Sequence, residues 1–317
     1  MASFTPTMET GTIALSGNPF DLQSTLESGQ SYLWWREDGE DFRESRIYGS
    51  DAWYLTTARV SGEPAVLRVR QVDDRIEWEA TIDVERLLRH RLRLDDDLVS
   101  IREQVPGEQP IDAAFDEYWG MHLVREPPFG TLVSFICSAQ MRVDRIHAMQ
   151  QALREAYGEP ITFDGRTVYT YPTPERLAAA SESELRGLSL GYRAPYVRKT
   201  AELVTEGLDP ADVRGLPYED ARKELTQFVG VGEKVADCVL LFSLGYLEAV
   251  PLDTWIRKTI ATYYPDCDRG GYADTSAAIR AVLGGEFAGY TQTYLFHYLR
   301  HTDSPPPGRS DSSGTSD

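Results

Sequence analysis

Residues 218–260 read YEDARKELTQFVGVGEKVADCVLLFSLGYLEAVPLDTWIRKTI, and this stretch decides the fold of the chain. Apolar residues at helical spacing predict one helix over residues 218–228 and a second, largely apolar helix over residues 234–244 that ends near Gly245. Between them, Gly230 and Gly232 allow a sharp turn that exposes backbone amides. The stretch therefore predicts a helix, a tight glycine hairpin and a second helix, with a third helix beginning at Thr254.

The hairpin and two ionisable residues predict a chemical site. The first amides of a helix lack intrahelical acceptors, and the helix dipole favours anions there, so the hairpin is a seat for phosphate. Lys234 opens an apolar helix, where an amine loses its proton more readily and can act as a nucleophile. Asp253 is placed to cap the third helix, and its carboxylate can stabilise positive charge on a sugar or handle protons. Taken singly, Lys234 also fits a solvated surface lysine, and Asp253 also fits a helix cap with no catalytic role.

The segments GVGEKVADC and AVPLDTW together resemble the helix-hairpin-helix and Gly/Pro-Asp motif of the DNA glycosylase superfamily. More narrowly, they resemble the 8-oxoguanine DNA glycosylase/lyases of the eukaryotic type, and the resemblance extends from about Leu15 to His301. It implies that Lys234 attacks C1′ and forms a Schiff base, while Asp253 stabilises the sugar cation. β-Elimination would then nick the DNA strand.

The resemblance also implies a pocket for the damaged base. Residues 26–35, LESGQSYLWW, resemble the SGQSFRW signature, in which the carbonyl of the glycine matching Gly29 accepts a hydrogen bond from N7–H of 8-oxoguanine. Leu33 stands where the family often has arginine. The segment AGYTQTYLF resembles AGWAQAVLF, so Gln292 would read the Watson–Crick edge of the base. The residues implied to enclose the base are Phe296 on one side, Cys238 on the other and Phe242 at the end. Without the resemblance, Cys238, Phe242 and Phe296 would be interpreted as core residues.

Four further residues are implied to hold the opened duplex. Gln140 stands where the family has the first of consecutive asparagines, which fills the space left by the flipped base, and Arg145 matches an arginine that contacts the orphaned cytosine. In LGYRAPY, Tyr192 would wedge into the duplex and a protruding Arg193 would pair with the cytosine. Gly230 and Gly232 would bind phosphate. Each of these residues also fits a structural role at the start of a helix.

The rest of the sequence predicts an α+β fold. Short runs rich in aromatic and β-branched residues, at 46–49, 52–57, 65–70 and 75–80, predict an N-terminal antiparallel β-sheet domain over residues 1–112, with a short helix near 84–92. Residues 113–302 are predicted to form a mainly α-helical helix-hairpin-helix catalytic domain, with a hairpin at Asp164-Gly165. Residues 303–317, rich in Pro, Ser, Gly and Asp, are expected to be disordered.

The formal net charge of −18 is unusual for a protein that binds DNA, because phosphate neutralisation drives most such binding. Only four of the 32 basic residues are lysine, and an acidic chain with scarce lysine is typical of salt-loving microbes. Taken alone, composition favours an acidic protein that binds no nucleic acid. The motifs favour the opposite.

Composition and cysteine content restrict the other possibilities. Three widely spaced cysteines indicate reduced thiols inside a cell and cannot supply the four ligands of the iron–sulfur cluster in endonuclease III-type relatives. The N-terminus has no secretory signal, and no apolar run is long enough to span a membrane. We therefore expect a cytoplasmic protein. The resemblance implies a nucleoid-associated monomer that acts on double-stranded DNA containing 8-oxoguanine, with no cofactor and no metal-ligating residues, and it leaves open a monovalent cation at the hairpin. Two alternatives stay open: a related glycosylase for alkylated purines and a non-catalytic helix-hairpin-helix DNA-binding protein.

Overall fold

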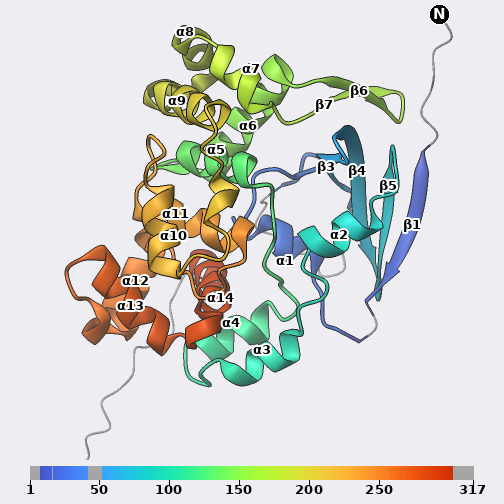
Figure 1. Cartoon of the computed structure of the whole chain (residues 1–317). Helices are drawn as coiled ribbons and strands as arrows, with labels where there is room; N and C mark the ends of the chain where they lie inside the picture. The colour runs from blue at the N-terminus through green and yellow to red at the C-terminus, as the bar shows by residue number, and fades with distance from the viewer. Residues whose placement is uncertain (1–7, 16, 42–51, 303–317) are drawn as a thin grey trace, which may run out of the picture.

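The computed structural model describes residues 8–15, 17–41 and 52–302, and a five-stranded antiparallel sheet forms its N-terminal part (Figure 1). The strand order is β1-β5-β4-β3-β2. The strands are β1 (Glu9–Ala14), β2 (Trp35–Arg36), β3 (Tyr54–Val60), β4 (Glu63–Val72) and β5 (Arg75–Ala80). Side chains on β5 alternate between buried and half-buried, because one face of the sheet covers the core and the other does not. The predicted sheet is confirmed, while the predicted run at residues 46–49 lies outside the described residues.

The edge strand β1 was not predicted from the sequence. Its residues, ETGTIA, include threonine and glycine rather than an apolar alternation. Gly11 pairs with Trp78 of β5, and the Trp78 ring lies where a side chain on Gly11 would be. Only glycine leaves room for this ring, so packing across the pair compensates for a weak strand pattern.

Helices make up most of the rest of the described chain and lie together on one side of the sheet (Figure 1). They are α1 (Leu22–Glu27), α2 (Glu85–Arg91), α3 (Leu98–Gln104), α4 (Ile111–Glu117), α5 (Pro128–Ser138), α6 (Val143–Tyr157), α7 (Pro174–Ala179), α8 (Glu182–Leu185), α9 (Ala194–Thr205), α10 (Tyr218–Leu225), α11 (Glu233–Val239), α12 (Thr254–Tyr263), α13 (Tyr272–Val282) and α14 (Ala288–His301). The predicted hairpin is also present, as β6 (Pro160–Phe163) and β7 (Arg166–Tyr169). The α+β fold expected from the sequence is confirmed, although α1 and α3 were not predicted.

The helix-hairpin-helix unit consists of α10 and α11. The helix predicted over residues 218–228 ends at Leu225, three residues early, and the chain then turns toward Gly230, which has φ +83°. The second helix begins at Glu233 and continues through a wider π-type turn over residues 240–244 to Gly245, which has left-handed φ as a helix-ending glycine commonly does. The third helix begins at Thr254 as predicted.

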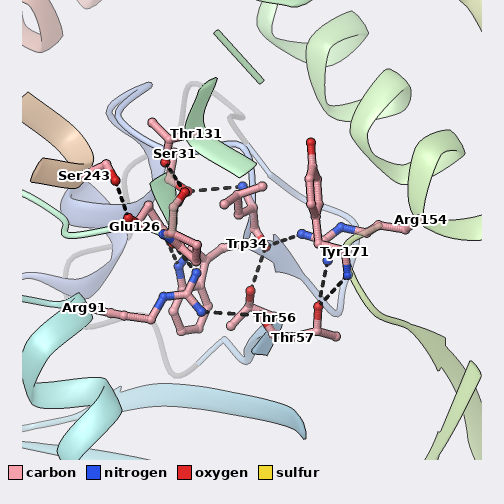
Figure 2. A network of polar contacts seen from close by, with 12 residues as sticks. Ser31, Trp34, Thr56, Thr57, Arg91, Glu126, Thr131, Arg154, Tyr171 and Ser243 are labelled. Carbon is pink, nitrogen blue, oxygen red and sulfur yellow. Dashed lines mark hydrogen bonds and ion pairs between the residues drawn. The ribbon is translucent and has the colours of Figure 1, made fainter. Parts of the chain in front are cut away.

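A buried polar network joins the sheet to the helices (Figure 2). Glu126, which precedes α5, accepts hydrogen bonds from Trp34 Nε1 at 2.7 Å and Ser31 Oγ at 2.9 Å, and it forms an ion pair with Arg91. Arg154 of α6 donates to the carbonyl of Leu33 at 2.8 Å. Removing one partner of a buried ion pair typically costs about 3–5 kcal/mol, so this network fixes residues 28–34 firmly against the helices.

Within the described residues, no helix combines the length and the apolar character needed to cross a membrane. The thiols of Cys137, Cys238 and Cys267 are all buried and free. The long α14 packs against α4, and α4 begins at the predicted domain boundary near residue 112. One hydrophobic core extends from the sheet into the helices.

Candidate active site

A cavity of about 960 Å³ opens among segments that are far apart in the sequence. Its walls come from the turn after α1, from α5 and the turn that follows it, from α11, from the loop before α12 and from α14. The sequence-predicted residues that line it are Gly29, Gln140, Lys234, Cys238, Phe242, Asp253, Gln292 and Phe296. The structure therefore brings both predicted catalytic residues and the entire predicted base pocket to one cavity.

Lys234 is the second residue of α11 and is half-buried at the cavity wall. Its Nζ lies 5.3 Å from the centre of the Phe135 ring, a distance at which a cation interacts with an aromatic face. One turn further, Cys238 is buried, and burial raises the pKa of its thiol to about 11, while the neighbouring Lys234 acts in the opposite direction. At neutral pH Cys238 is therefore a neutral thiol beside Lys234.

Asp253 is the N-cap of α12. Its Oδ1 accepts a hydrogen bond from the amide of Ile256 at 2.8 Å, as the sequence predicted. Burial raises the pKa of this carboxyl, whereas the Ile256 amide and the charge of Lys234 act to lower it. Lys234 and Asp253 thus line the same cavity, and the charge of Lys234 acts on the Asp253 carboxyl.

The predicted base pocket has aromatic side chains in its walls. Gly29 has φ +90°, and a Cβ added to it would lie 3.3 Å from the Phe296 ring, so a side chain here would be strained and crowded. On the other side, Phe242 stacks on Phe135 with ring centres 5.7 Å apart and planes 19° apart. Gln292, one turn before Phe296 on α14, is buried at the cavity wall. A flat group with hydrogen-bonding edges fits this combination of rings, backbone and amide.

Three further residues that the sequence did not predict as site residues also line the cavity: Tyr32, His147 and Arg300. Arg300 lies four residues after Phe296 on α14, with its guanidinium 6.0 Å from the Phe296 ring centre and its charge acting on Asp253. The i, i+4 spacing from Phe296 was a signal that could have identified Arg300. Tyr32 and His147 pack edge to face at 5.4 Å, and burial lowers the pKa of His147 to about 4, so this ring is neutral.

Tyr192 and Arg193 lie beside the turn between α5 and α6, close to Gln140. Tyr192 is 50% exposed, and its hydroxyl lies 3.5 Å from the Ala139 carbonyl. Arg193 was expected to protrude, and this expectation is wrong for the structure: Arg193 is 4% exposed and donates to the same carbonyl. The physical reason is that Ala139 follows the last residue of α5 and its carbonyl accepts from Arg193, while the Tyr192 ring covers the guanidinium at 4.3 Å.

Of the remaining predicted DNA contacts, Gln140 lines the exposed rim of the cavity, whereas Arg145, Gly230 and Gly232 are exposed outside it. Arg145 is exposed on the first turn of α6, and Gln140 has φ +53° and is exposed at the cavity rim. Gly230 combines positive φ with close contact to the Tyr196 side chain, so a larger residue is excluded there. Gly232 is the N-cap of α11 and provides no side-chain cap, which leaves the first amides of the helix available to a ligand.

Comparison with known proteins identifies the superfamily to which this chain belongs. Residues 133–282 match the HhH-GPD superfamily of base excision DNA repair proteins. The probable N-glycosylase/DNA lyase of Methanothermobacter thermautotrophicus is 31% identical over 304 residues, which cover 89% of this chain and 94% of that protein. The N-glycosylase/DNA lyase of Saccharomyces cerevisiae is 31% identical, covering 78% of this chain and 69% of that one. The chain belongs to the N-glycosylase/DNA lyase family of the HhH-GPD superfamily.

A solved structure agrees with this assignment across nearly the whole chain. The 8-oxoguanine glycosylase/lyase of Clostridium acetobutylicum, in complex with double-stranded DNA containing cytosine opposite 8-oxoguanine, superposes with a TM-score of 0.78 at 25% identity. The match covers 93% of this chain and 97% of that one. The family expected from the sequence motifs is confirmed.

Proposed function

We propose that this chain is a bifunctional base-excision repair enzyme that excises 8-oxoguanine opposite cytosine and then nicks the strand as an AP lyase. The observation that carries the proposal is the cavity, which brings Lys234 and Asp253 together with Gly29, Gln292 and Phe296 from four separate segments. The names of similar proteins support the same activity. The enzyme would act as a monomer on genomic DNA in the cytoplasm.

Opening of the duplex comes first in the proposed mechanism. The base must leave the stack before its sugar can be reached, which costs a few kcal/mol. The exposed Tyr192 would wedge into the duplex, Gln140 would fill the space of the flipped base, and Arg145 and Arg193 would contact the orphaned cytosine. For this, Arg193 would exchange its bond to the Ala139 carbonyl for a bond to the base. The amides near Gly230 and Gly232 would hold the phosphate backbone.

In the chemical step, the neutral amine of Lys234 forms a bond to C1′ as the bond from C1′ to the base breaks, and the electron pair leaves with the base. Asp253 would stabilise the positive charge that develops on the sugar. The nitrogen then gives one proton to the departing base, its lone pair breaks the C1′–O4′ bond, and O4′ takes up a proton as the sugar ring opens, which leaves a protonated Schiff base at C1′. Removal of a proton from C2′ expels the 3′ phosphate and cleaves the strand.

Two alternatives remain, a glycosylase for alkylated purines and a DNA-binding module without catalysis. The first is disfavoured because the segment that carries Lys234 resembles the glycosylase/lyases, and the probable N-glycosylase/DNA lyase matches this chain over 94% of its own length. The second is disfavoured because Lys234 and Asp253 line one cavity and burial raises the pKa of Asp253. Shifted pKa values of this kind are typical of catalytic sites, and a DNA-binding module has no need of one.

Substrate choice tests the proposal directly. Under single-turnover conditions, duplexes containing 8-oxoguanine, an alkylated purine or uracil are expected to differ, with 8-oxoguanine opposite cytosine released fastest. Gln292→Ala is expected to lower that rate by about 5- to 100-fold, because one buried hydrogen bond to the base, worth about 1–3 kcal/mol, is lost.

Gln292→Ala should leave the affinity for an abasic-site analogue nearly unchanged, since that duplex has no base to contact. Gln104→Ala serves as the control, because Gln104 is exposed on α3 and bonds only locally to the Ser100 carbonyl. Equal loss of excision and abasic-site affinity in Gln292→Ala would mean that Gln292 is structural. Faster release of the alkylated purine would favour the alternative glycosylase.

Salt is expected to raise both stability and activity. The chain carries 50 carboxylates against 32 basic residues, so its attraction to DNA at long range is weak or repulsive. At molar salt the Debye length is about 3 Å, which removes most of this repulsion while stacking and short hydrogen bonds survive. A titration from low salt toward roughly molar potassium chloride should raise the thermal midpoint and the excision rate together. A maximum of both below roughly 0.1 M salt, where the Debye length is about 10 Å, would refute the halophilic interpretation alone.

A further inference from the structure

Asp237 of α11 is a buried carboxylate that the proposed mechanism does not use. It lies between Lys234 and Cys238 in the sequence, is 0% exposed and does not line the cavity. Its Oδ1 accepts from the Tyr218 hydroxyl at 2.6 Å and its Oδ2 from the Tyr272 hydroxyl at 2.7 Å. Arg222 supplies the nearest opposite charge, 3.9 Å away. Both oxygens of the Asp237 carboxyl are therefore engaged by tyrosine hydroxyls inside the protein.

Tyr272 makes a second contact that Tyr218 does not make. Its hydroxyl, at the first residue of α13, accepts a hydrogen bond from the backbone amide of Leu252 at 3.0 Å. Leu252 immediately precedes Asp253 in the loop Pro251–Asp253, whose residues line the cavity. The bonds thus form a chain from the Leu252 amide through the Tyr272 hydroxyl to Asp237, and α11 also carries Lys234.

We propose that Tyr272 and Asp237 are positioning residues that hold the loop bearing Asp253 in register with the helix bearing Lys234. This inference rests on the proposed function, because it assigns the two residues to the geometry of that same reaction. Lys234 and Asp253 stand on different elements, so their separation depends on what joins those elements. Reaction rates fall steeply when reacting groups are misplaced, by up to about 10²-fold for a displacement near 1 Å.

The two tyrosines provide a matched pair of variants. Tyr272→Phe and Tyr218→Phe each keep the ring and each remove one hydroxyl that donates to Asp237. Each also removes one acceptor, that of the Leu252 amide in Tyr272→Phe and that of a 3.4 Å bond from Arg222 Nη1 in Tyr218→Phe. Each ring is also flanked by two guanidinium groups, those of Arg222 and Arg257 for Tyr272 and those of Arg222 and Arg280 for Tyr218. Only Tyr272→Phe breaks the link to the loop at Leu252. A difference between the variants therefore reports on the link rather than on the burial of Asp237.

The test compares single-turnover excision of 8-oxoguanine, affinity for an abasic-site analogue and the thermal midpoint. We expect Tyr272→Phe to lower the excision rate by roughly 10-fold or more, within the range that misplacement produces. Tyr218→Phe should stay within about twofold of the wild-type rate, and both variants should show similar falls in thermal midpoint and similar DNA affinity. Equal rates in the two variants, whether both normal or both lowered, would overturn the proposal.

Amide hydrogen exchange supplies a second measurement that does not depend on activity. The Leu252 amide should be protected in the wild-type protein and should exchange faster in Tyr272→Phe, while the amides of α11 are unchanged. An unprotected Leu252 amide in the wild type would overturn the proposal even if Tyr272→Phe did not fold. Failure of the proposed function looks different: the wild-type protein itself would neither release 8-oxoguanine nor be trapped on DNA with an abasic site.

Discussion

Lys234→Gln is expected to abolish borohydride trapping on DNA containing 8-oxoguanine and to lower the excision rate by at least roughly three orders of magnitude. Loss of a covalent nucleophile has effects on this scale, because no other group takes over the bond to the substrate. Glutamine keeps most of the length of the lysine side chain but cannot form an imine. The wild-type amine lies half-buried against Phe135, at the wall of the cavity that also holds Asp253.

The chain offers a sharp control for this variant, because it contains only four lysines, at positions 199, 223, 234 and 258. Lys223 is exposed on α10, within the same helix-hairpin-helix unit, so Lys223→Gln removes one positive charge from this unit without touching the cavity. We expect normal trapping in Lys223→Gln. Trapping that persists in Lys234→Gln would show that another amine forms the Schiff base.

Asp253→Asn is expected to lower the excision rate by about 10² to 10³-fold, the usual cost of losing a group that stabilises charge in the transition state. This substitution removes the charge of Asp253 but preserves its capping hydrogen bond. An asparagine oxygen can still accept the hydrogen bond from the Ile256 amide, and asparagine caps helices about as well as aspartate. Binding to an abasic-site analogue should therefore persist, and single-turnover kinetics beside a binding titration would separate the two effects.

Stability and pH give Asp253→Asn a distinctive signature. Burial raises the pKa of Asp253, so folding disfavours its ionised form, and the folded protein is penalised at any pH above that raised pKa. Asparagine removes the penalty, so the thermal midpoint at neutral pH should be equal to or above that of the wild type. The wild-type excision rate should fall as pH drops through the raised pKa, and this contribution of Asp253 to the pH dependence should be absent from the variant.

Asp97→Asn is the matched control, since Asp97 also caps a helix, α3, by accepting from the Ser100 amide at 3.0 Å. It lies outside the cavity, and we expect a normal excision rate. A large loss of thermal stability in Asp253→Asn, with excision falling only in proportion to unfolding, would mean that Asp253 is a helix cap and nothing more.

Local features of the chain were predictable because their causes are local. The turn at Gly230, the helix end at Gly245 and the cap at Asp253 depend on residues within a few positions, and the structure has all three. Two of the short helices, α1 and α3, were missed, since six and seven residues carry too few turns for a clear periodic pattern.

Contacts between distant segments could not be read from spacing. The approach of Phe296 to Gly29 joins opposite ends of the chain, and only resemblance to a family placed both residues in one pocket. The inward orientation of Arg193 depends on the Ala139 carbonyl, which sequence patterns do not connect to it. Asp237 is similar, because a carboxylate inside an apolar helix indicates nothing until Tyr218 and Tyr272 are seen to enclose it.

Peptide mapping of the borohydride-trapped complex shows directly whether Lys234 is the residue that bonds to the DNA. The wild-type protein would be trapped on a duplex with 8-oxoguanine opposite cytosine and digested with nuclease and trypsin. Because a reduced adduct blocks cleavage at Lys234, we predict that the nucleotide remnant appears on a peptide spanning residues 224–257. A remnant on a peptide containing Lys199, Lys223, Lys258 or the N-terminus, or release of the base with no trapped complex, would contradict the account.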